Sequence, residues 1–426
     1  MNDMTCLADG VVVPADFSQT GLNLNEVVVG PTGCGKSFSN AYSRLLYTEN
    51  SSVVVPIAKG ALKKQFSGLF EERGYQVVDL DFSHPERCEI GYDPLDYVIS
   101  EEDVIHLARS LVGAADSKDK QGNNDPYWNE SGASVLAAEI GLVLMNAKKA
   151  GRKPCFGDVV DLHRSMKVVE SQRDGFHTNL DALFHEAERR FPGNQYCEMW
   201  KTICGLAEKT ASCIFSVVNS SLDKICSKSV IELTRKKRRV DLRMLGSEKT
   251  ALFITTSPIN KTLQNFVNVL YGDMFRVLFE AAEASENSRL RIPVHIICDD
   301  FACGSRIVDF EDYISIFRAA GISVTMLLQS ETQLADMYGE RAATTIINNC
   351  DTYVYMGGMD IETCKNVSLR INKPLNKVLS MPLEHVIVFR RGSEPVEALR
   401  YQTLKDSRYQ QLLKMTAKKA AGDGRD

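Results

Sequence analysis

Short runs of β-branched and other apolar residues alternate with helix-like stretches over most of the chain. The runs lie at 27–29, 53–55, 76–80, 250–255, 293–298, 322–328, 352–356 and 385–389. Between them, apolar residues recur with helical spacing, for example in 37–46 and 263–284. This alternation predicts an α/β fold with a mainly parallel sheet.

The middle of the chain has a different pattern. After a polar stretch at 114–125 that is typical of a loop, apolar positions follow a helical period and no strand-like run interrupts them until about residue 230. We therefore expect an all-α domain inserted into the α/β core. The expected division is a first α/β part (1–112), the insertion (113–235), a second α/β part (236–413) and a flexible tail (414–426).

Composition narrows the function classes. Of the 426 residues, 44% are hydrophobic and 25% are charged, which excludes fibrous and wholly disordered proteins. The formal net charge of -5 argues against a nucleic-acid binder that is basic overall, but it allows a local basic surface. No stretch approaches the roughly 18–20 apolar residues of a membrane-spanning helix. As sequenced, the chain is therefore expected to be cytoplasmic.

Residues 30–37 fit the pattern G-x-x-x-x-G-K-[ST] at every fixed position, between a strand-like run and a helix-like stretch. Glycines let successive backbone N–H groups converge on phosphate oxygens, and the following helix adds its positive amino end. The motif predicts a phosphate loop that binds ATP, made of Gly30, Pro31, Thr32, Gly33, Cys34, Gly35, Lys36 and Ser37. We expect Lys36 to contact the β- and γ-phosphates and Ser37 to bind Mg²⁺.

Two consecutive carboxylates, Asp299 and Asp300, end the run at 293–298. The carboxyl ends of parallel strands are where ligands bind in such sheets. We expect Asp299 to hold Mg²⁺, mostly through water, and Asp300 to act as general base on the attacking water. The alternative is a solvated Asp-Asp turn. The next run leads to Gln329, which either senses the γ-phosphate and orients water or is an ordinary strand-end amide.

Arg318 has two interpretations. It lies near the end of an expected helix at 309–320, where the helix dipole favours a cation. Spacing alone favours this structural role. The second interpretation is an arginine finger that reaches a neighbouring subunit.

The distance between Lys36 and Asp299 distinguishes among classes of P-loop proteins. Small GTPases keep these motifs close and carry an Asn-Lys-x-Asp base reader, whereas 260–263 here lacks the Asp. No Arg-rich lid of the kind found in nucleotide kinases is evident. An acidic strand end followed by a strand that ends in Gln fits a RecA-like core better.

At this point the sequence resembles the type IV secretion coupling proteins of the TraG/TraD kind, which are ATPases that deliver DNA and its attached relaxase to a conjugation channel. The resemblance covers about 10–401. It is carried by LNEVVVG (24–30), YDPL (92–95), DPYW (125–128), ALF (251–253), CDDFA (298–302), LQS (328–330) with QL (333–334) and YG (338–339), and FRRGSEP (389–395).

The resemblance implies a nucleotide-binding domain, formed by 1–112 and 236–413, that is interrupted by the all-α domain. It implies a homohexamer around a DNA channel, with ATP hydrolysis between subunits, and it favours Arg318 as a finger and Gln329 as a sensor. The implied partners are DNA, a relaxase or relaxosome, and the proteins of the type IV secretion channel. The helical insertion would face the cytosol and help to select cargo.

Two features depart from the family pattern. The family usually has Asp-Glu where this chain has Asp299 and Asp300, and the shorter side chain leads us to expect slow hydrolysis, because attack geometry is sensitive to shifts of about 1 Å. The family's N-terminal transmembrane anchor is also missing from this sequence. We therefore expect association with the inner face of the bacterial membrane through partners.

The one dense basic run, Arg235 to Arg239, is the candidate DNA contact. Repeated in each subunit of a hexamer, it would give a ring of phosphate contacts; the alternative is a solvated surface. The function expected is an ATPase that recruits a relaxase–DNA substrate and drives or gates its delivery to a secretion channel. The alternatives are a nucleotide-gated adaptor for protein cargo with little hydrolysis, or another hexameric DNA motor of the FtsK-like or virion-packaging type.

Overall fold

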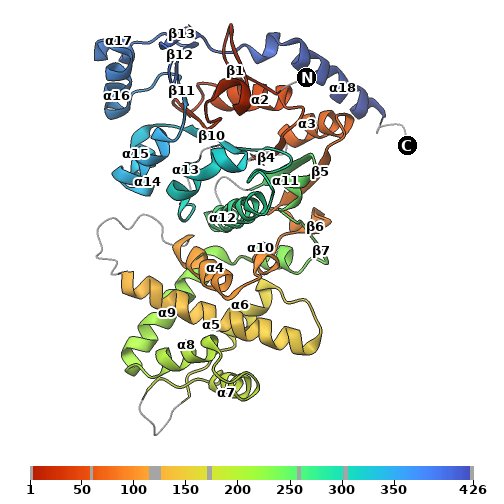
Figure 1. Ribbon diagram of the computed structural model, residues 1–426, viewed down its shortest axis with the longest axis vertical. Helices are drawn as coiled ribbons and strands as arrows, with labels where there is room; N and C mark the ends of the chain where they lie inside the picture. The colour runs from red at the N-terminus through yellow and green to blue at the C-terminus, as the bar shows by residue number, and fades with distance from the viewer. Residues whose placement is uncertain are drawn as a thin grey trace.

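A nine-stranded sheet forms the framework of one half of the molecule (Figure 1). The structure is a computed structural model that describes residues 3–57, 61–114, 126–169, 175–256, 261–299, 301 and 306–422. In spatial order the strands are β13 (Val396–Leu399), β12 (His385–Arg390), β11 (Thr352–Tyr355), β3 (Glu26–Val29), β10 (Ile322–Leu328), β9 (Val294–Cys298), β4 (Ser52–Ile57), β8 (Thr250–Thr255) and β5 (Gln76–Asp81). The strands from β11 to β5 are parallel, and β12 and β13 are antiparallel at one edge. The expected α/β core is confirmed.

Helices cover both faces of this sheet. Successive residues of a strand point to opposite faces, so Val28 packs in one hydrophobic core and Val27 in the other. The core around Val28 contains α2 (Tyr42–Tyr47), α3 (Ala61–Glu72) and α18 (Ser407–Gly422). The core around Val27 contains α12 (Lys261–Glu283), α13 (Phe310–Ala320), α14 (Glu331–Tyr338), α15 (Glu340–Asn348), α16 (Ile361–Ile371) and α17 (Leu375–Leu379).

The other half of the molecule is helical and lies below the sheet in Figure 1. It contains α4 (Glu101–Ala114), α5 (Pro126–Ala150), α6 (Phe156–Arg164), α7 (Asp181–Arg190), α8 (Gln195–Cys204), α9 (Glu208–Ile225) and α10 (Lys228–Thr234). Within 126–169 and 175–234 the structure has no strand, only a single bridge between Val168 and Thr178. Its core includes Trp200, whose ring stacks on Phe184 with 4.3 Å between centroids. Apart from α4, which begins before the expected start at residue 113, these helices fall within the expected all-α insertion (113–235).

The segment that enters the helical half and the segment that leaves it lie next to each other. Two short segments, β6 (Ile90–Gly91) and β7 (Arg238–Arg239), form a parallel pair there, and η3 (Pro94–Tyr97) follows β6. Close to this junction the Tyr92 hydroxyl donates to Asp273 of α12 over 2.6 Å. Burial raises the pKa of Asp273 to about 7, against the lowering effects of Tyr92 and Arg276. The junction is therefore fixed by buried polar contacts as well as by apolar packing.

Several elements were not anticipated from the sequence. They include the β1 (Met4–Ala8) and β2 (Val11–Pro14) hairpin, α1 (Phe17–Thr20), η2 (Pro85–Arg87), β6, α6, α10, β7, α11 (Met244–Ser247), α14 to α17, β13 and η4 (Thr403–Lys405). The expected flexible tail from 414 also differs, because α18 continues to Gly422. Tyr409 and Leu412 are buried against the sheet core and anchor that helix. None of the described helices is long and apolar enough to span a membrane.

Candidate functional site

The loop at 30–37 connects β3 to the helix that follows it, at the carboxyl edge of the parallel strands. Gly33 and Gly35 have φ angles of 81° and 93°, in the left-handed region that favours glycine. A Cβ atom on Gly30 would lie 2.7 Å from the Sγ of Cys34 and 2.9 Å from the Cβ of Met356. The loop therefore needs glycine at all three positions to hold this conformation.

The Lys36 side chain turns back over the loop. Its ammonium donates to the carbonyl oxygens of Gly30 over 2.6 Å and Pro31 over 3.0 Å, and the residue is only 7% exposed. A buried positive charge thus lies along the inner side of the loop. The first turn after Lys36 is a π-type turn, η1 (Ser37–Ala41), which continues directly into α2.

Ser37 and Asp299 are brought together from distant parts of the chain. The Ser37 hydroxyl donates to Oδ2 of Asp299 over 2.8 Å, and Asp299 directly follows β9. A hydroxyl oxygen beside a carboxylate is a donor set that suits Mg²⁺. The third expected acid–base residue, Asp300, lies outside the described residues.

Gln329 follows β10, the strand between β3 and β9. Leu328 pairs with Val29, and the backbone N–H of Gly30 donates to the Leu328 carbonyl over 3.1 Å. Gln329 is therefore level with the first glycine of the loop, at the same sheet edge as Asp299. The topology places the expected sensor beside the expected phosphate site.

Arg318 lies elsewhere. It is in the last turn of α13, which leads into the opposite, amino end of β10. The seven residues of β10, at about 3.3 Å each, separate the two edges by roughly 20 Å. The exposed Arg318 guanidinium stacks over the ring of Phe17 at 4.4 Å, and Arg289 approaches the same ring at 5.0 Å. Within one chain, the structure does not bring Arg318 to the phosphate loop.

The sequence matches the protein family described as "Type IV secretory system Conjugative DNA transfer" over residues 11–373. The chain belongs to this family. The resemblance to type IV coupling proteins is thereby confirmed. In a sequence comparison, no curated protein matches the chain.

Solved structures of similar fold include a bacterial conjugative coupling protein. The bacterial conjugative coupling protein TrwBdeltaN70 has a TM-score of 0.67 and 17% identity, covering 94% of this chain and 88% of that chain. TrwB in complex with ADP and Mg²⁺ has a TM-score of 0.65 and 18% identity, covering 93% and 89%. VirB4 of Thermoanaerobacter pseudethanolicus has a TM-score of 0.53 and 15% identity, covering 96% and 98%. At this identity the likeness shows the fold, and the expected RecA-like P-loop core is confirmed.

A buried polar chain links β3, β9 and β10 to α2. Arg44 has only donors, so its 3.1 Å contact makes Nδ1 of His295 an acceptor and leaves the imidazole proton on Nε2. That nitrogen lies 2.9 Å from the Thr325 hydroxyl, which donates to Glu26 over 3.3 Å. Burial, reinforced by Arg44, holds the pKa of His295 well below its usual value, and burial raises the pKa of Glu26.

The basic run expected to contact DNA is largely paired with carboxylates. Arg239 has a side chain only 8% exposed, and its guanidinium lies 2.8 Å from Asp96 and 3.4 Å from Asp93. Ion pairs also join Arg235 to Asp161, Lys236 to Glu232 and Arg238 to Glu89. Arg239 is therefore a structural residue of the junction. Lys237 and Arg238 are exposed and remain candidates for phosphate contact.

Sequence reasoning missed one residue at the loop. Nη1 of Arg400 donates to the carbonyl oxygen of Cys34 over 2.7 Å, across 366 positions of sequence. No motif marks Arg400, because its position depends on the path that the chain takes after β13. The only hint was its place near the end of the region, about 10–401, that resembles the family.

Proposed function

We propose that the chain is the ATPase of a conjugative DNA transfer system, which recruits a relaxase–DNA substrate and drives or gates its delivery to the secretion channel. The observation that carries the proposal is the contact between Ser37 and Asp299 beside an intact phosphate loop, in a chain of the conjugative DNA transfer family. The nucleotide of this proposal is ATP with Mg²⁺, supported by structures of TrwB in complex with ADP and Mg²⁺ and in complex with a non-hydrolysable ATP analogue.

Each residue of the site has a role in this proposal. Backbone N–H groups of the phosphate loop and the Lys36 ammonium bind the phosphates, and Ser37 and Asp299 hold the metal, Asp299 mostly through water. Magnesium held by Ser37 and Asp299 would neutralise charge on the phosphate oxygens. Gln329 senses the γ-phosphate or orients the attacking water. Asp300 removes the proton from that water.

Arg318 acts between subunits in this proposal. Because it lies at the sheet edge opposite its own loop, only a neighbouring copy can receive it at a phosphate site. An arginine that approaches the γ-phosphate stabilises the charge of the transition state. The arrangement requires an oligomer, and we propose a homohexamer around a DNA channel. The all-α insertion would help to select cargo, and partners would hold the assembly at the inner membrane face.

A hydrolysis assay on the purified full chain tests the function. We expect ATP hydrolysis to rise when DNA is added and to be abolished in Lys36→Ala. The matched control is Lys209→Ala, a change at an exposed lysine of α9. Binding of ATP without DNA-stimulated hydrolysis would instead support the nucleotide-gated adaptor, and the absence of ATP binding would overturn both.

The length of the Asp300 side chain sets the expected rate. The family's usual Glu reaches about one methylene further, so Asp300→Glu should bring the carboxylate closer to the attacking water and raise kcat. The nucleotide affinity should stay the same, because the change affects the base and not the phosphate loop. An unchanged or lower kcat in this variant would count against Asp300 as the cause of slow hydrolysis.

A further inference from the structure

The chain returns to the phosphate loop after β13. Arg400 lies between the loop and Glu384: Nη1 donates to the Cys34 carbonyl over 2.7 Å, and Nη2 donates to Oε1 of Glu384 over 3.2 Å. The backbone N–H of Arg400 also donates to the carbonyl of Glu384 over 2.6 Å. A Cβ on Gly35 would lie 2.8 Å from Nη1, so the guanidinium packs directly against the loop.

Glu384 is held in a costly backbone conformation. Its φ angle of 71° is in the left-handed region, which is unfavourable for a residue with a Cβ. In this conformation the carbonyl and the carboxylate of Glu384 both accept hydrogen bonds from Arg400. The arginine is therefore held from the side opposite the loop.

The hydrogen bond to Cys34 fixes the direction of a phosphate-facing amide. The peptide unit between Cys34 and Gly35 is planar and trans, so its C=O and N–H point in opposite directions. When Arg400 holds the carbonyl on the outer side of the loop, the Gly35 N–H points to the inner side, where Lys36 lies. Arg400 thus acts on the phosphate site through the backbone.

The residues after Arg400 follow the helix that carries the loop. The Thr403 hydroxyl donates to the carbonyl of Phe38 over 2.7 Å, in the first turn after the loop. The ring of Tyr409 packs edge-on against Phe38, with 5.6 Å between centroids, and against Tyr42 at 6.2 Å. The segment 400–409 therefore contacts both the loop and the start of its helix.

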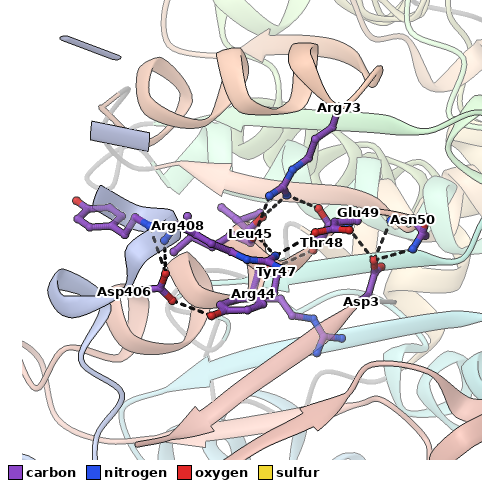
Figure 2. Close-up of polar contacts among 12 residues, drawn as sticks. Asp3, Arg44, Leu45, Tyr47, Thr48, Glu49, Asn50, Arg73, Asp406 and Arg408 are labelled. Carbon is purple, nitrogen blue, oxygen red and sulfur yellow. Dashed lines mark hydrogen bonds and ion pairs between the residues drawn. The ribbon is translucent and has the colours of Figure 1, made fainter. Parts of the chain in front are cut away.

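The same segment also reaches the far end of that helix, as Figure 2 shows. Arg408 donates to the Leu46 carbonyl over 3.4 Å and to Glu49 over 3.1 Å, and Arg73 donates to the Leu46 carbonyl over 2.9 Å. Asp406 accepts from Tyr47 over 3.0 Å. Cations at the carboxyl end of a helix stabilise it and satisfy its last carbonyls.

We propose that Arg400 is a positioning residue for phosphate binding. In the same proposal, docking of the segment 400–409 is coupled to nucleotide binding, because this segment contacts the phosphate loop and both ends of the helix that follows it. The proposal rests on the proposed nucleotide site. Coupling is reciprocal, so nucleotide binding should in turn stabilise the docked segment. Lysine should replace Arg400 only in part, because one ammonium cannot reproduce the fork that joins the carbonyl and the carboxylate.

Nucleotide affinity of the full-length chain tests the positioning role. Arg400→Ala removes a charged hydrogen bond, whose contribution is reduced by solvent because the Arg400 side chain is 30% exposed. We expect the variant to bind ADP about tenfold more weakly. Arg400→Lys should recover part of this loss. AMP binding should change little, so the ratio of ADP to AMP affinity should fall; simple destabilisation would lower both affinities alike. Arg189→Ala, at an exposed arginine of α7, is the control.

A second measurement follows the coupling directly. Amide hydrogen exchange across 400–409 should slow when ADP and Mg²⁺ are added to the wild type, and this protection should be lost in Arg400→Ala. Glu384→Gln keeps the backbone hydrogen bond between Arg400 and the Glu384 carbonyl, so it should lose less of this protection. It provides a second test in case Arg400→Ala fails to fold. If wild type and Arg400→Ala bind ADP equally and Lys36→Ala does not bind, the positioning role is overturned while the nucleotide site stands. If the wild type itself binds no ADP, both proposals fail.

Discussion

Ser37 and Asp299 are joined by a hydrogen bond of 2.8 Å although 262 positions separate them in the sequence. Ser37 ends the phosphate loop that follows β3, Asp299 directly follows β9, and β10 lies between these two strands. The contact therefore depends on the order of three parallel strands. It is the strongest geometric support for a metal–nucleotide site in this family member.

The Ser37–Asp299 pair predicts a specific loss of magnesium dependence. Ser37→Ala removes one proposed metal ligand and leaves the loop N–H groups and Lys36 in place. We expect ADP affinity with Mg²⁺ to fall about tenfold or more, and ADP affinity without Mg²⁺ to stay nearly unchanged. Titration of labelled ADP with and without the metal measures the difference. Ser212→Ala on α9 is the control, and an equal loss in both titrations would contradict a metal role.

The glycine at position 35 predicts a second, separable effect. Gly35→Ala and Gly74→Ala both place a Cβ on a residue with positive φ, which should cost about 1 kcal/mol of unfolding free energy in each case. At Gly74 the added Cβ meets open space, whereas at Gly35 it meets Arg400 at 2.8 Å. We expect only Gly35→Ala to lose nucleotide binding. Parallel denaturant unfolding and ADP titration check this, and comparable ADP affinity in the two variants would refute it.

The buried Asp273 predicts a pH dependence of stability. Burial raises its folded-state pKa to about 7, above the unfolded value of roughly 3.9. The folded state therefore binds the proton more tightly, and the resulting stabilisation is complete below about pH 4 and is lost as the pH rises to about 7. Asp273→Asn keeps an acceptor for Tyr92 and removes the titration, so the unfolding free energy of the variant minus that of wild type should increase over this range.

Denaturant unfolding at several pH values measures that difference for Asp273. Asp312→Asn, at an exposed position of α13, is the control and should leave the pH profile of wild type intact. A difference between Asp273→Asn and wild type that stays constant from pH 4 to pH 8 would mean that Asp273 does not titrate there.

The sequence predicts the central parts of the site because their chemistry is local to strand ends. The phosphate loop needs glycines at fixed positions, and Asp299 and Gln329 each directly follow an apolar strand. Parallel strands deliver their carboxyl ends to one edge, so the neighbourhood of these residues follows from topology. The mainly parallel α/β core and its helical interruption could be predicted for the same reason, from the change of hydrophobic period along the chain.

Other features depend on tertiary packing that no local pattern records. Arg400 reaches Cys34 only because β12 and β13 reverse direction and return the chain to the loop. The helix α18 persists past 414 because Tyr409 and Leu412 find a hydrophobic core on α2 and α3. The basic run looked like a DNA surface, but Arg239 is buried between carboxylates that are far away in sequence.

The basic run therefore predicts a restricted DNA contact. We expect Lys237→Ala with Arg238→Ala to weaken DNA binding and to reduce the salt dependence of the affinity by about one unit of log–log slope for each lost phosphate contact. Neutralising Arg239 should instead destabilise the junction, because the fully buried carboxylate of Asp93 loses the cation beside it. DNA affinity at several salt concentrations and thermal unfolding separate the two effects. An unchanged salt slope in the double variant would exclude this run as a phosphate contact.

The position of Arg318 predicts complementation between two inactive variants. Arg318→Ala keeps an intact phosphate loop and should bind ATP normally without hydrolysing it, whereas Lys36→Ala keeps an intact Arg318. Mixed oligomers should recover hydrolysis, because some sites combine a wild-type loop with a neighbour's arginine. Phe17→Ala removes the ring under Arg318 and should lower kcat about two- to fivefold, while Phe17→Trp should retain activity. Steady-state hydrolysis at fixed total protein measures both effects: mixtures of the two inactive variants report complementation, and the Phe17 variants alone report kcat. If the mixture is no more active than either variant alone while both still assemble, Arg318 is only the helix-end cation that its spacing first suggested.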